Sequence, residues 1–311
     1  MVSAGELELP DSEEVDAPAH LVGVGCYAVE WRRDRVAMYI VVCAKMVPDT
    51  TQVKIDPVTN TLVREDVPFI TNPFDTPAIE EALRLKDRYG ARVTAISMGP
   101  PAAESVLRRA ISLGVDDGVL LSDRVFGGAD TLATSKVLAA AIEKLGTVEP
   151  VDLVICGQQT IDGDTAQVGP GIACRLGIPQ LTLVDEISVV NAEEGLIEAR
   201  RRLEEQYEII EAKLPALLTV VREINLPRYP TVPGRLEAAD VVLPVWDNSV
   251  LKLDPARIGL RGSPTQVKKI FAPERAKGET ISGEGDRAPA AIAQVLEKLV
   301  EWDFVRLCNG D

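Results

Sequence analysis

Short apolar runs alternate with segments of helical apolar spacing over the first two thirds of the chain. Runs that are apolar at nearly every position predict strands over residues 39–44, 92–97, 118–121, 151–156 and 216–222. Helices are predicted between these strands, over residues 102–113 and after N-caps at Thr76 and Asp130. Strands that are apolar on both faces are typical of a parallel sheet with helices on either side. The pattern therefore predicts an α/β fold with right-handed crossover connections.

The pattern changes after Gly177. Neighbouring strands of a β-rich insertion are predicted over residues 184–190, 196–202 and 206–212. The last third is rich in proline and glycine, with a short helix predicted over 235–240 and an amphipathic helix from about Pro289. So long a segment with little core of its own predicts a C-terminal arm, residues 230–311, that wraps a partner. The alternative is a loosely packed extension of the domain at residues 38–229.

Residues 1–37 differ from the rest of the chain. They contain 3 Lys or Arg and 8 Asp or Glu, and they lack the basic start of a signal peptide. We predict that they lie outside the folded body, either as a disordered tail or because the native protein starts at Met38. The codons of Trp31-Arg32-Arg33 can encode a purine-rich ribosome-binding sequence, which favours the start at Met38. N-terminal sequencing of protein expressed from its native gene tests this hypothesis.

Charge and composition narrow the classes of function. The formal net charge of −15 argues against nucleic acid and an anionic membrane surface as partners. No apolar run approaches the ~20 residues of a membrane-spanning helix. The five cysteines form no CxxC pair, so we predict structural thiols in a reducing cytoplasm and no metal site. The single histidine, His20, lies in the acidic extension, which leaves the body without the histidine of hydrolase triads and zinc motifs.

One stretch, from Gly157 to Gly169, has the pattern of an anion site. It follows an apolar strand and leads into an apolar helical segment at residues 171–176. Amide groups in the first turn of such a helix point outward, and the helix dipole favours negative charge there. Glycines let the backbone approach a phosphate closely, and Thr160 and Thr165 add hydroxyl donors. The alternative is a glycine-rich loop before a capped helix, with no ligand. In parallel sheets, ligands bind at the carboxyl ends of strands, where we predict loops 45–48, 98–100, 122–131 and 157–169.

Six short motifs resemble the beta subunit of electron-transfer flavoproteins. They occur in the family's order, at residues 42–45, 72–74, 97–100, 162–170, 225–229 and 262–265. The resemblance covers about Met38 to Val300. It implies a Rossmann-like domain that binds an adenine nucleotide, and a long C-terminal arm that embraces an alpha subunit carrying FAD. The loop is similar to that of the bifurcating, FAD-binding branch of the family (FixA-like).

The same resemblance implies roles for individual residues. By position, the residues that line the adenine nucleotide, partly through backbone atoms, are Cys43, Asn72 and Met98. The phosphate-binding loop comprises Asp162, Gly163, Asp164, Thr165, Ala166, Gln167, Val168 and Gly169. Ile224 and Asn225 fall in a loop that docks onto an acyl-CoA dehydrogenase. No residue is implied to be catalytic, because the chemistry belongs to the flavin.

Two features favour FAD over AMP. The loop from Gly163 to Val168 departs from the AMP-binding pattern, and Thr131 and Thr134 lie one turn apart where bifurcating members contribute two threonines to the flavin. The alternative for these threonines is a pair of surface residues behind an Asp N-cap. The resemblance implies hydride transfer from NADH to the FAD of this subunit. One electron then passes to ferredoxin or flavodoxin, and the other passes through the alpha-subunit FAD to a dehydrogenase or quinone oxidoreductase.

Three alternatives to bifurcation stay open on the sequence. The first keeps the family but places structural AMP in the site, so that the chain is half of a simple electron carrier without NADH-oxidising activity. The second is an adenylating or pyrophosphatase-type enzyme on a similar fold, although the chain has no Ser-Gly-Gly-x-Asp-Ser loop and no Walker lysine. The third is a nucleotide-sensing module without redox function.

Overall fold

The computed structural model describes residues 38–49, 54–55, 62–63, 68–191, 193–265, 280–302 and 304. These residues fall into two compact units. The first is the α/β body up to residue 265, and the second contains Ile55 and the described residues from 280 onward. The predictions for residues 1–37 lie outside the described residues. Two short strands pair with each other between residues 54 and 63, β3 (Lys54–Ile55) and β4 (Leu62–Val63).

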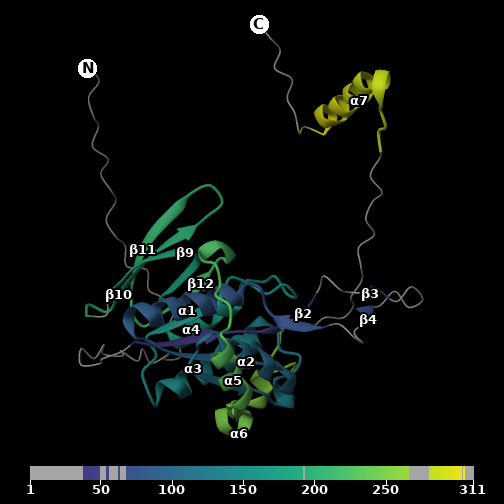
Figure 1. Ribbon diagram of the computed structural model, residues 1–311. Helices are drawn as coiled ribbons and strands as arrows, with labels where there is room; N and C mark the ends of the chain where they lie inside the picture. Colours follow the sequence, from purple (N-terminus) through teal and green to yellow (C-terminus); the bar gives the residue numbers. More distant parts are fainter. Residues whose placement is uncertain are drawn as a thin grey trace, which may run out of the picture. The chain divides into compact units, whose positions relative to one another are not determined.

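A nine-stranded sheet forms the centre of the body (Figure 1). Its order is β11-β10-β9-β12-β8-β1-β6-β7-β13. The strands from β9 to β13 in this order run parallel, and β9, β10 and β11 form an antiparallel end. The strands are β1 (Tyr39–Cys43), β6 (Arg92–Met98), β7 (Asp117–Leu121), β8 (Leu153–Gly157), β9 (Gln180–Asn191), β10 (Leu196–Arg202), β11 (Tyr207–Lys213), β12 (Ala216–Val220) and β13 (Val245–Trp246). This arrangement confirms the predicted α/β fold.

Helices cover both faces of the sheet. They are α1 (Asp75–Tyr89), α2 (Glu104–Leu113), α3 (Thr131–Gly146) and α4 (Val168–Leu176). Ile40 and Val42 of β1 belong to one core with α1 and α2, whereas Tyr39 and Val41 belong to a second core with α3 and α4. The two sets alternate because successive strand side chains point to opposite faces. Every residue of β1 is therefore buried, which explains its uninterrupted apolar run.

The start of α1 differs from the prediction. The sequence pattern placed the N-cap at Thr76, but the helix begins at Asp75 and its N-cap is Phe74. The side chain of Asp75 turns inward and accepts hydrogen bonds from the backbone N–H of Lys45 at 2.7 Å and from Nδ2 of Asn72 at 2.9 Å. These contacts place Asp75 in the first turn, so that tertiary structure overrides the local capping preference of threonine.

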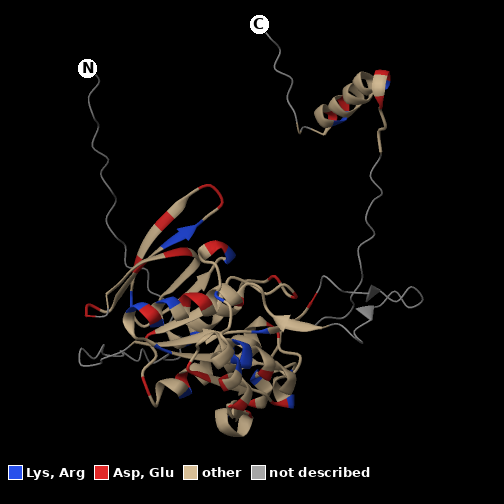
Figure 2. Cartoon of the chain, in the orientation of Figure 1, with Lys and Arg blue, Asp and Glu red and all other residues tan. Residues whose placement is uncertain are grey.

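The antiparallel end of the sheet carries consecutive arginines on β10, which lie among acidic neighbours in Figure 2. Arg200 pairs with Asp185 and with Glu186, each at 2.9 Å, and Arg201 pairs with Glu208 at 3.2 Å. Ion pairs of an exposed arginine add little to stability, because water and salt screen them. We infer that these pairs favour the observed strand register more than they add to the stability of the body.

The first part of the predicted arm packs on the body. α5 (Val232–Asp240) lies against α2, β13 pairs with β7 as a parallel edge strand, and α6 (Asn248–Leu251) follows beside α3. Backbone contacts help to hold this segment, among them the hydrogen bond from the N–H of Leu120 to the carbonyl of Pro244 at 3.0 Å, and Leu243 is buried in the core. Short 3-10 helices lie at residues 101–103, 124–126, 222–224, 255–257 and 285–287. The wrapping of a partner by the arm stays a prediction.

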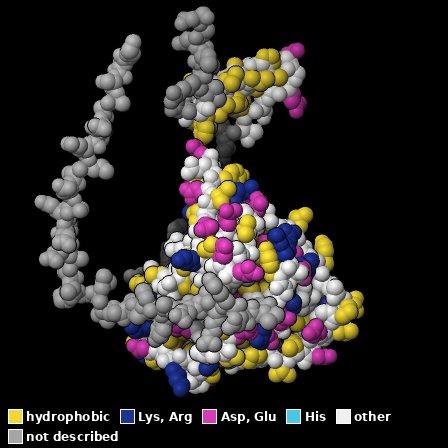
Figure 3. All heavy atoms as spheres, turned by 90° about the vertical axis from the view of Figure 1, so that its left-hand side faces the viewer, with side chains coloured by type: hydrophobic (Ala, Val, Ile, Leu, Met, Phe, Trp, Pro, Cys, Tyr) yellow, Lys and Arg dark blue, Asp and Glu magenta, His cyan; other side chains and the backbone are white. Residues whose placement is uncertain are grey.

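Helix α7 (Ala288–Glu301) belongs to the second unit and begins where the sequence predicted a helix. Its predicted apolar stripe includes Ile292, Val295 and Leu296, which are 60%, 41% and 44% exposed. In Figure 3, hydrophobic side chains (yellow) gather on α7. Such an exposed stripe is typical of an interaction surface. In the part of the chain that the structure describes, no helix is long and apolar enough to cross a membrane.

Candidate functional site

The predicted site residues gather at one edge of the sheet. Cys43 ends β1, Met98 ends β6 and Gly157 ends β8, and these three strands are parallel neighbours. The register pairs Cys43 with Ile96. The loops that follow the strands therefore lie together, at the edge where open α/β sheets bind ligands. The structure confirms the predicted strand, loop and helix around this edge, although the helix α4 begins at Val168, three residues earlier than the apolar segment suggested.

Asn72 lies at the base of this edge and is fully buried. Its Nδ2 donates to Oδ1 of Asp75 at 2.9 Å and to the carbonyl of Gln159 at 2.8 Å. Its Oδ1 accepts from the N–H of Ile161 at 3.3 Å. The side chain of Asn72 thus ties the start of α1 to the loop that follows β8. The prediction that Asn72 lies at the site by position agrees with this geometry, and its contact with a nucleotide stays a prediction.

The glycines of the loop serve the protein's own packing. A Cβ on Gly157 would lie 2.4 Å from Oδ1 of Asp75 and 2.6 Å from the carbonyl carbon and oxygen of Phe74. A Cβ on Gly169 would lie 2.5 Å from Cγ2 of Thr219. We expected these glycines to admit a phosphate, but both are required because α1 approaches β8 and α4 approaches β12. A Cβ on Gly163 would make only an ordinary contact at 3.4 Å.

The segment between β8 and α4 has an unusual backbone. Asp164 and Ala166 have φ values of 50° and 55°, in the left-handed region that favours glycine. Strained residues of this kind cluster at functional sites. The backbone N–H groups from Thr165 to Gly169 make no hydrogen bond to any other described residue. Free amides at a helix N-terminus form a cradle for an anion, so this segment suits a phosphate.

One ion pair closes the outer side of the loop. The ammonium group of Lys45 lies 2.7 Å from Oδ2 of Asp162. Desolvation acts to raise the pKa of Asp162, but hydrogen bonds from Lys45 and Thr160 outweigh it and lower the pKa below the ordinary value. Asp162 therefore remains a carboxylate that anchors the loop to the segment after β1. The sequence resemblance placed Asp162 at the phosphate, whereas the structure shows its carboxylate paired with a lysine.

Two thiols lie on neighbouring strands below the loop. Cys43 of β1 and Cys156 of β8 are both buried and both free. A hydrogen bond with Cys43, together with burial, raises the pKa of the Cys156 thiol well above its ordinary value. Cys156 is therefore a neutral thiol and a poor nucleophile near pH 7. Both side chains belong to the core on the α3 and α4 face.

The start of α3 joins the site to the arm. The side chain of Asp130 accepts from the N–H of Ala133 at 3.0 Å, which confirms the predicted N-cap. It also accepts from the hydroxyl of Thr265 at 2.8 Å and from its N–H at 3.1 Å. The hydroxyl of Ser263 accepts from the N–H of Asp130 at 2.8 Å. These contacts give the motif at residues 262–265 a structural role that the sequence did not reveal.

Thr131 and Thr134 lie in the first turn of α3, and both are half-buried. The next residue on this face, Ser135, meets the first turn of α4, because a Cβ on Gly171 would lie 2.8 Å from its hydroxyl. Arg175 donates from Nε to the hydroxyl of Ser135 at 3.2 Å. The starts of α3 and α4 are therefore packed together, so that the two threonines and the amide-rich segment lie on adjacent helices.

Replacing Asp130 with alanine is expected to lower the free energy of unfolding by about 1–2 kcal/mol, because α3 loses its N-cap. Desolvation raises the pKa of Asp130, but hydrogen bonds from Ala133 and Thr265 outweigh it and lower the pKa. A lowered folded-state pKa gives stability that is present above pH ~4 and is lost as the pH falls further. Urea unfolding at pH 7 and pH 3 measures both effects. Asp130→Asn, which keeps a capping side chain, is the control, and an equal loss in both variants would contradict the assignment.

The predicted docking loop is anchored on α1. Asn225 is buried, and its Nδ2 donates to the carbonyl of Pro77 and to Oε2 of Glu81, both at 2.9 Å. Ile224 is half-buried against the core. The exposed apolar residues of this loop are Leu226 and Tyr229, whose exposed fractions are 87% and 89%. Asn225 thus positions the loop, and docking of a partner through Ile224 and Asn225 stays a prediction.

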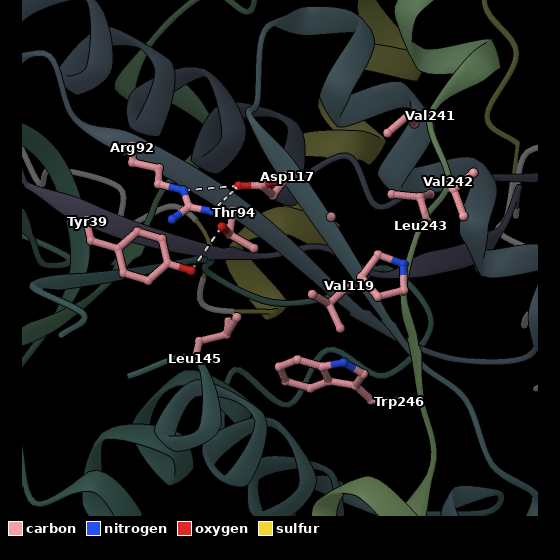
Figure 4. Close-up of a pocket in the computed structure, with 12 residues that line it drawn as sticks. Tyr39, Arg92, Thr94, Asp117, Val119, Leu145, Val241, Val242, Leu243 and Trp246 are labelled. Atoms are coloured by element: carbon pink, nitrogen blue, oxygen red, sulfur yellow. Dashed lines mark hydrogen bonds and ion pairs between the residues drawn. The ribbon is translucent and has the colours of Figure 1, made fainter. Parts of the chain in front are cut away.

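A cavity of about 230 Å³ lies at the other end of the strands (Figure 4). Its polar lining residues come from the amino-terminal ends of β1, β6 and β7 and pair with one another. Arg92 lies 2.6 Å from Asp117, and the hydroxyl of Tyr39 donates to Thr94 at 3.0 Å. Trp246 closes the opposite wall. Because its polar groups are already paired, the cavity is a weaker candidate than the edge at the carboxyl ends.

Two residues of the site were not singled out from the sequence. Lys45 is the last residue of the motif at residues 42–45, and Asp75 directly follows the motif at residues 72–74, but no role was predicted for either residue. The role of Asp75 was not predicted because the next two residues, Thr76 and Pro77, have the pattern of an N-cap and a first helical position. The available signal was an acidic residue directly after Asn72-Pro73-Phe74, at a position where the chain enters a buried helix.

Comparisons with known proteins identify the family of this chain. Residues 59–251 match the family model described as electron transfer flavoprotein domain. Electron transfer flavoprotein subunit beta of Megasphaera elsdenii is 49% identical over 273 residues, which cover 86% of this chain and 100% of that protein. Protein FixA of Azotobacter vinelandii is 47% identical over 265 residues, covering 84% and 94%. The caffeyl-CoA reductase-Etf complex subunit CarD of Acetobacterium woodii is 47% identical over 265 residues, covering 84% and 99%. This chain therefore belongs to the electron transfer flavoprotein family, as a beta subunit of the FixA-like type.

Proposed function

We propose that this beta subunit binds FAD at the carboxyl edge of its sheet and bifurcates electrons from NADH. The observation that carries the proposal is the packing of α4, which follows the amide-rich segment, against Ser135 near the start of α3. AMP needs a cradle for one phosphate, whereas FAD has a diphosphate and a flavin that extend further. A second helix start with Thr131 and Thr134 beside the first supports the longer ligand.

The residues of the edge fit such a cofactor. Free amides from Thr165 to Gly169 and the dipole of α4 would hold the phosphates. Cys43, Asn72 and Met98 would line the adenine side, and the two threonines of α3 would contact the remainder of FAD. Bound FAD supplies redox chemistry that protein side chains lack, because a flavin exchanges two electrons with a nicotinamide and single electrons with other carriers. The chain's own residues bind and orient it.

Partners follow from the same proposal. A beta subunit implies an electron transfer flavoprotein alpha subunit, and the exposed stripe of α7 supports an arm that contacts it. We propose ferredoxin or flavodoxin as the low-potential acceptor, and an acyl-CoA dehydrogenase or quinone oxidoreductase beyond the alpha-subunit FAD. The name of the Acetobacterium woodii relative places that protein in a complex with a reductase. The cytoplasm is the proposed location.

The count of FAD per heterodimer tests the proposal. This chain is co-expressed with its alpha subunit, and FAD and AMP are assayed in the same extract at pH 8. Two FAD and no AMP are expected. One FAD and one AMP would overturn bifurcation and leave the alternative, a simple electron carrier with structural AMP. NADH oxidation by the complex, measured from flavin absorbance, is the next expected result.

A further inference from the structure

Asp75 is buried below the loop and is not among the residues expected to touch the nucleotide. Its carboxylate accepts hydrogen bonds from the N–H of Lys45 at 2.7 Å and from Nδ2 of Asn72 at 2.9 Å. Gly157 packs closely against this carboxylate, because a Cβ there would lie 2.4 Å from Oδ1 of Asp75. The two donors belong to the segment after β1 and to the turn before α1, and the packing contact belongs to the end of β8. A single carboxylate therefore sets the relative position of three separate segments.

Asn72 extends this network into the loop. Its Nδ2 faces Asp75 and the carbonyl of Gln159, and its Oδ1 faces the N–H of Ile161. Both hydrogen bonds that the carboxylate accepts come from N–H donors. A proton on the oxygen that now accepts from one of these N–H groups would place an O–H against that N–H and would break the contact.

We propose that Asp75 is a positioning residue, and this proposal rests on the nucleotide site proposed above. The carboxylate form of Asp75 holds residues 158–161 in the shape that receives the nucleotide. Uptake of a proton by Asp75 releases this segment.

The surroundings of Asp75 make such proton uptake accessible near neutral pH. Burial raises the pKa of Asp75 to about 7, against the opposing effects of the hydrogen bonds from Lys45 and Asn72 and of the positive charge of Lys45. Two other titratable groups face this region. Asp162 is paired with Lys45 and has a lowered pKa, and Cys156 has a raised pKa. The group that changes charge near pH 7 is therefore Asp75.

The proposal predicts two opposite dependences on pH. The pKa of Asp75 is raised above its ordinary value of 3.8, so the nucleotide-free protein binds this proton more tightly when folded. Its stability then falls as the pH rises from about 4 to about 7. Nucleotide affinity rises over the upper part of this range, because the competent carboxylate form becomes populated. If only that form binds, the apparent affinity weakens about tenfold between pH 8 and pH 6.

The test uses the heterodimer of this chain with its alpha subunit, stripped of the beta-subunit nucleotide. AMP and FAD are each titrated calorimetrically at pH 6, 7 and 8. The parent protein should bind about tenfold more weakly at pH 6 than at pH 8. Asp75→Asn should bind weakly at every pH, because its amide offers one acceptor oxygen and no titrating group. Asp185→Asn is the control and should keep the parent profile, because it removes a carboxylate of β9 that pairs with Arg200 of β10.

A flat profile in the parent protein, or the parent slope in Asp75→Asn, would overturn the proposal. If Asp75→Asn does not fold, hydrogen exchange of the amides of residues 158–161 in the parent replaces it. Exchange corrected for its intrinsic pH dependence should be faster at pH 6, and equal protection at pH 6 and 8 would also overturn the proposal. A heterodimer that binds neither AMP nor FAD at any pH would overturn the proposed function as well, whereas binding that is independent of pH would overturn the role of Asp75 alone.

Discussion

Gly157→Ala is expected to lower the melting temperature by about 6–12 °C and to empty the nucleotide site. The new Cβ would lie 2.4 Å from Oδ1 of Asp75 and 2.6 Å from two backbone atoms of Phe74. Backbone atoms cannot move aside as a flexible side chain can, so α1 must shift away from β8. Overpacking of this kind costs about 3 kcal/mol, and each kcal/mol lowers the melting temperature by about 2–4 °C in a domain of this size. Thermal unfolding and nucleotide content of the heterodimer measure the two effects.

Gly146→Ala is the matched control for this substitution. Gly146 ends α3, and a Cβ there would meet no atom within 4 Å. The same chemical change is therefore expected to leave the melting temperature unchanged or to raise it slightly, since alanine favours helix more than glycine does. If Gly157→Ala melts within 2 °C of the parent and retains its nucleotide, α1 does not approach β8 as closely as described.

Asn72→Ala is expected to lower the free energy of unfolding by about 2–3 kcal/mol and to reduce nucleotide content. The substitution leaves the carbonyl of Gln159 and the N–H of Ile161 without their buried partner, and it removes one donor from the carboxylate of Asp75. A buried polar group left without a partner costs about 1–3 kcal/mol. Urea unfolding at pH 8 gives the stability, and absorbance of the extracted flavin gives the content.

Asn191→Ala is the control for the loss of an asparagine. Its Oδ1 accepts from the N–H groups of Glu193 and Glu194, both at 3.1 Å, in the exposed turn between β9 and β10. Water replaces the lost acceptor there, so we expect a change below about 0.5 kcal/mol and no effect on the nucleotide. Equal losses in Asn72→Ala and Asn191→Ala would show that Asn72 does not organise the loop.

The strands and helices of the body were predictable because their buried positions are occupied by apolar residues with strand or helix spacing. β1 is apolar at every position because both of its faces are covered, and the predicted strand at residues 196–202 coincides with β10. The start of α1 was not predictable. Thr76 has the local signature of a cap, but the outcome was decided by Asp75, whose hydrogen-bond partner Lys45 is 30 residues away.

The edge strand β13 shows a second limit. It has only two residues, and its pairing with β7 depends on backbone hydrogen bonds that any sequence can make. For the site, the sequence marked the correct loop but not the purpose of its glycines. The sequence pattern predicted that Gly157 and Gly169 leave space for a phosphate. In the structure, Phe74 lies beside Gly157 and Thr219 lies beside Gly169, where a side chain would otherwise be. Contacts between distant segments decide such points, and a local pattern does not contain them.

The tether between Asp130 and the arm also has a consequence for the order of folding. Asp130 and Thr265 are separated by 135 residues, so their contact cannot form on a nascent chain until most of the protein has been made. At synthesis rates of about 5–20 residues per second, this interval lasts roughly 7 to 27 s. The sheet strands β1, β6, β7 and β8 have all left the ribosome long before. The proposed binding edge therefore gains its contact with the arm only after the sheet that carries this edge has been made.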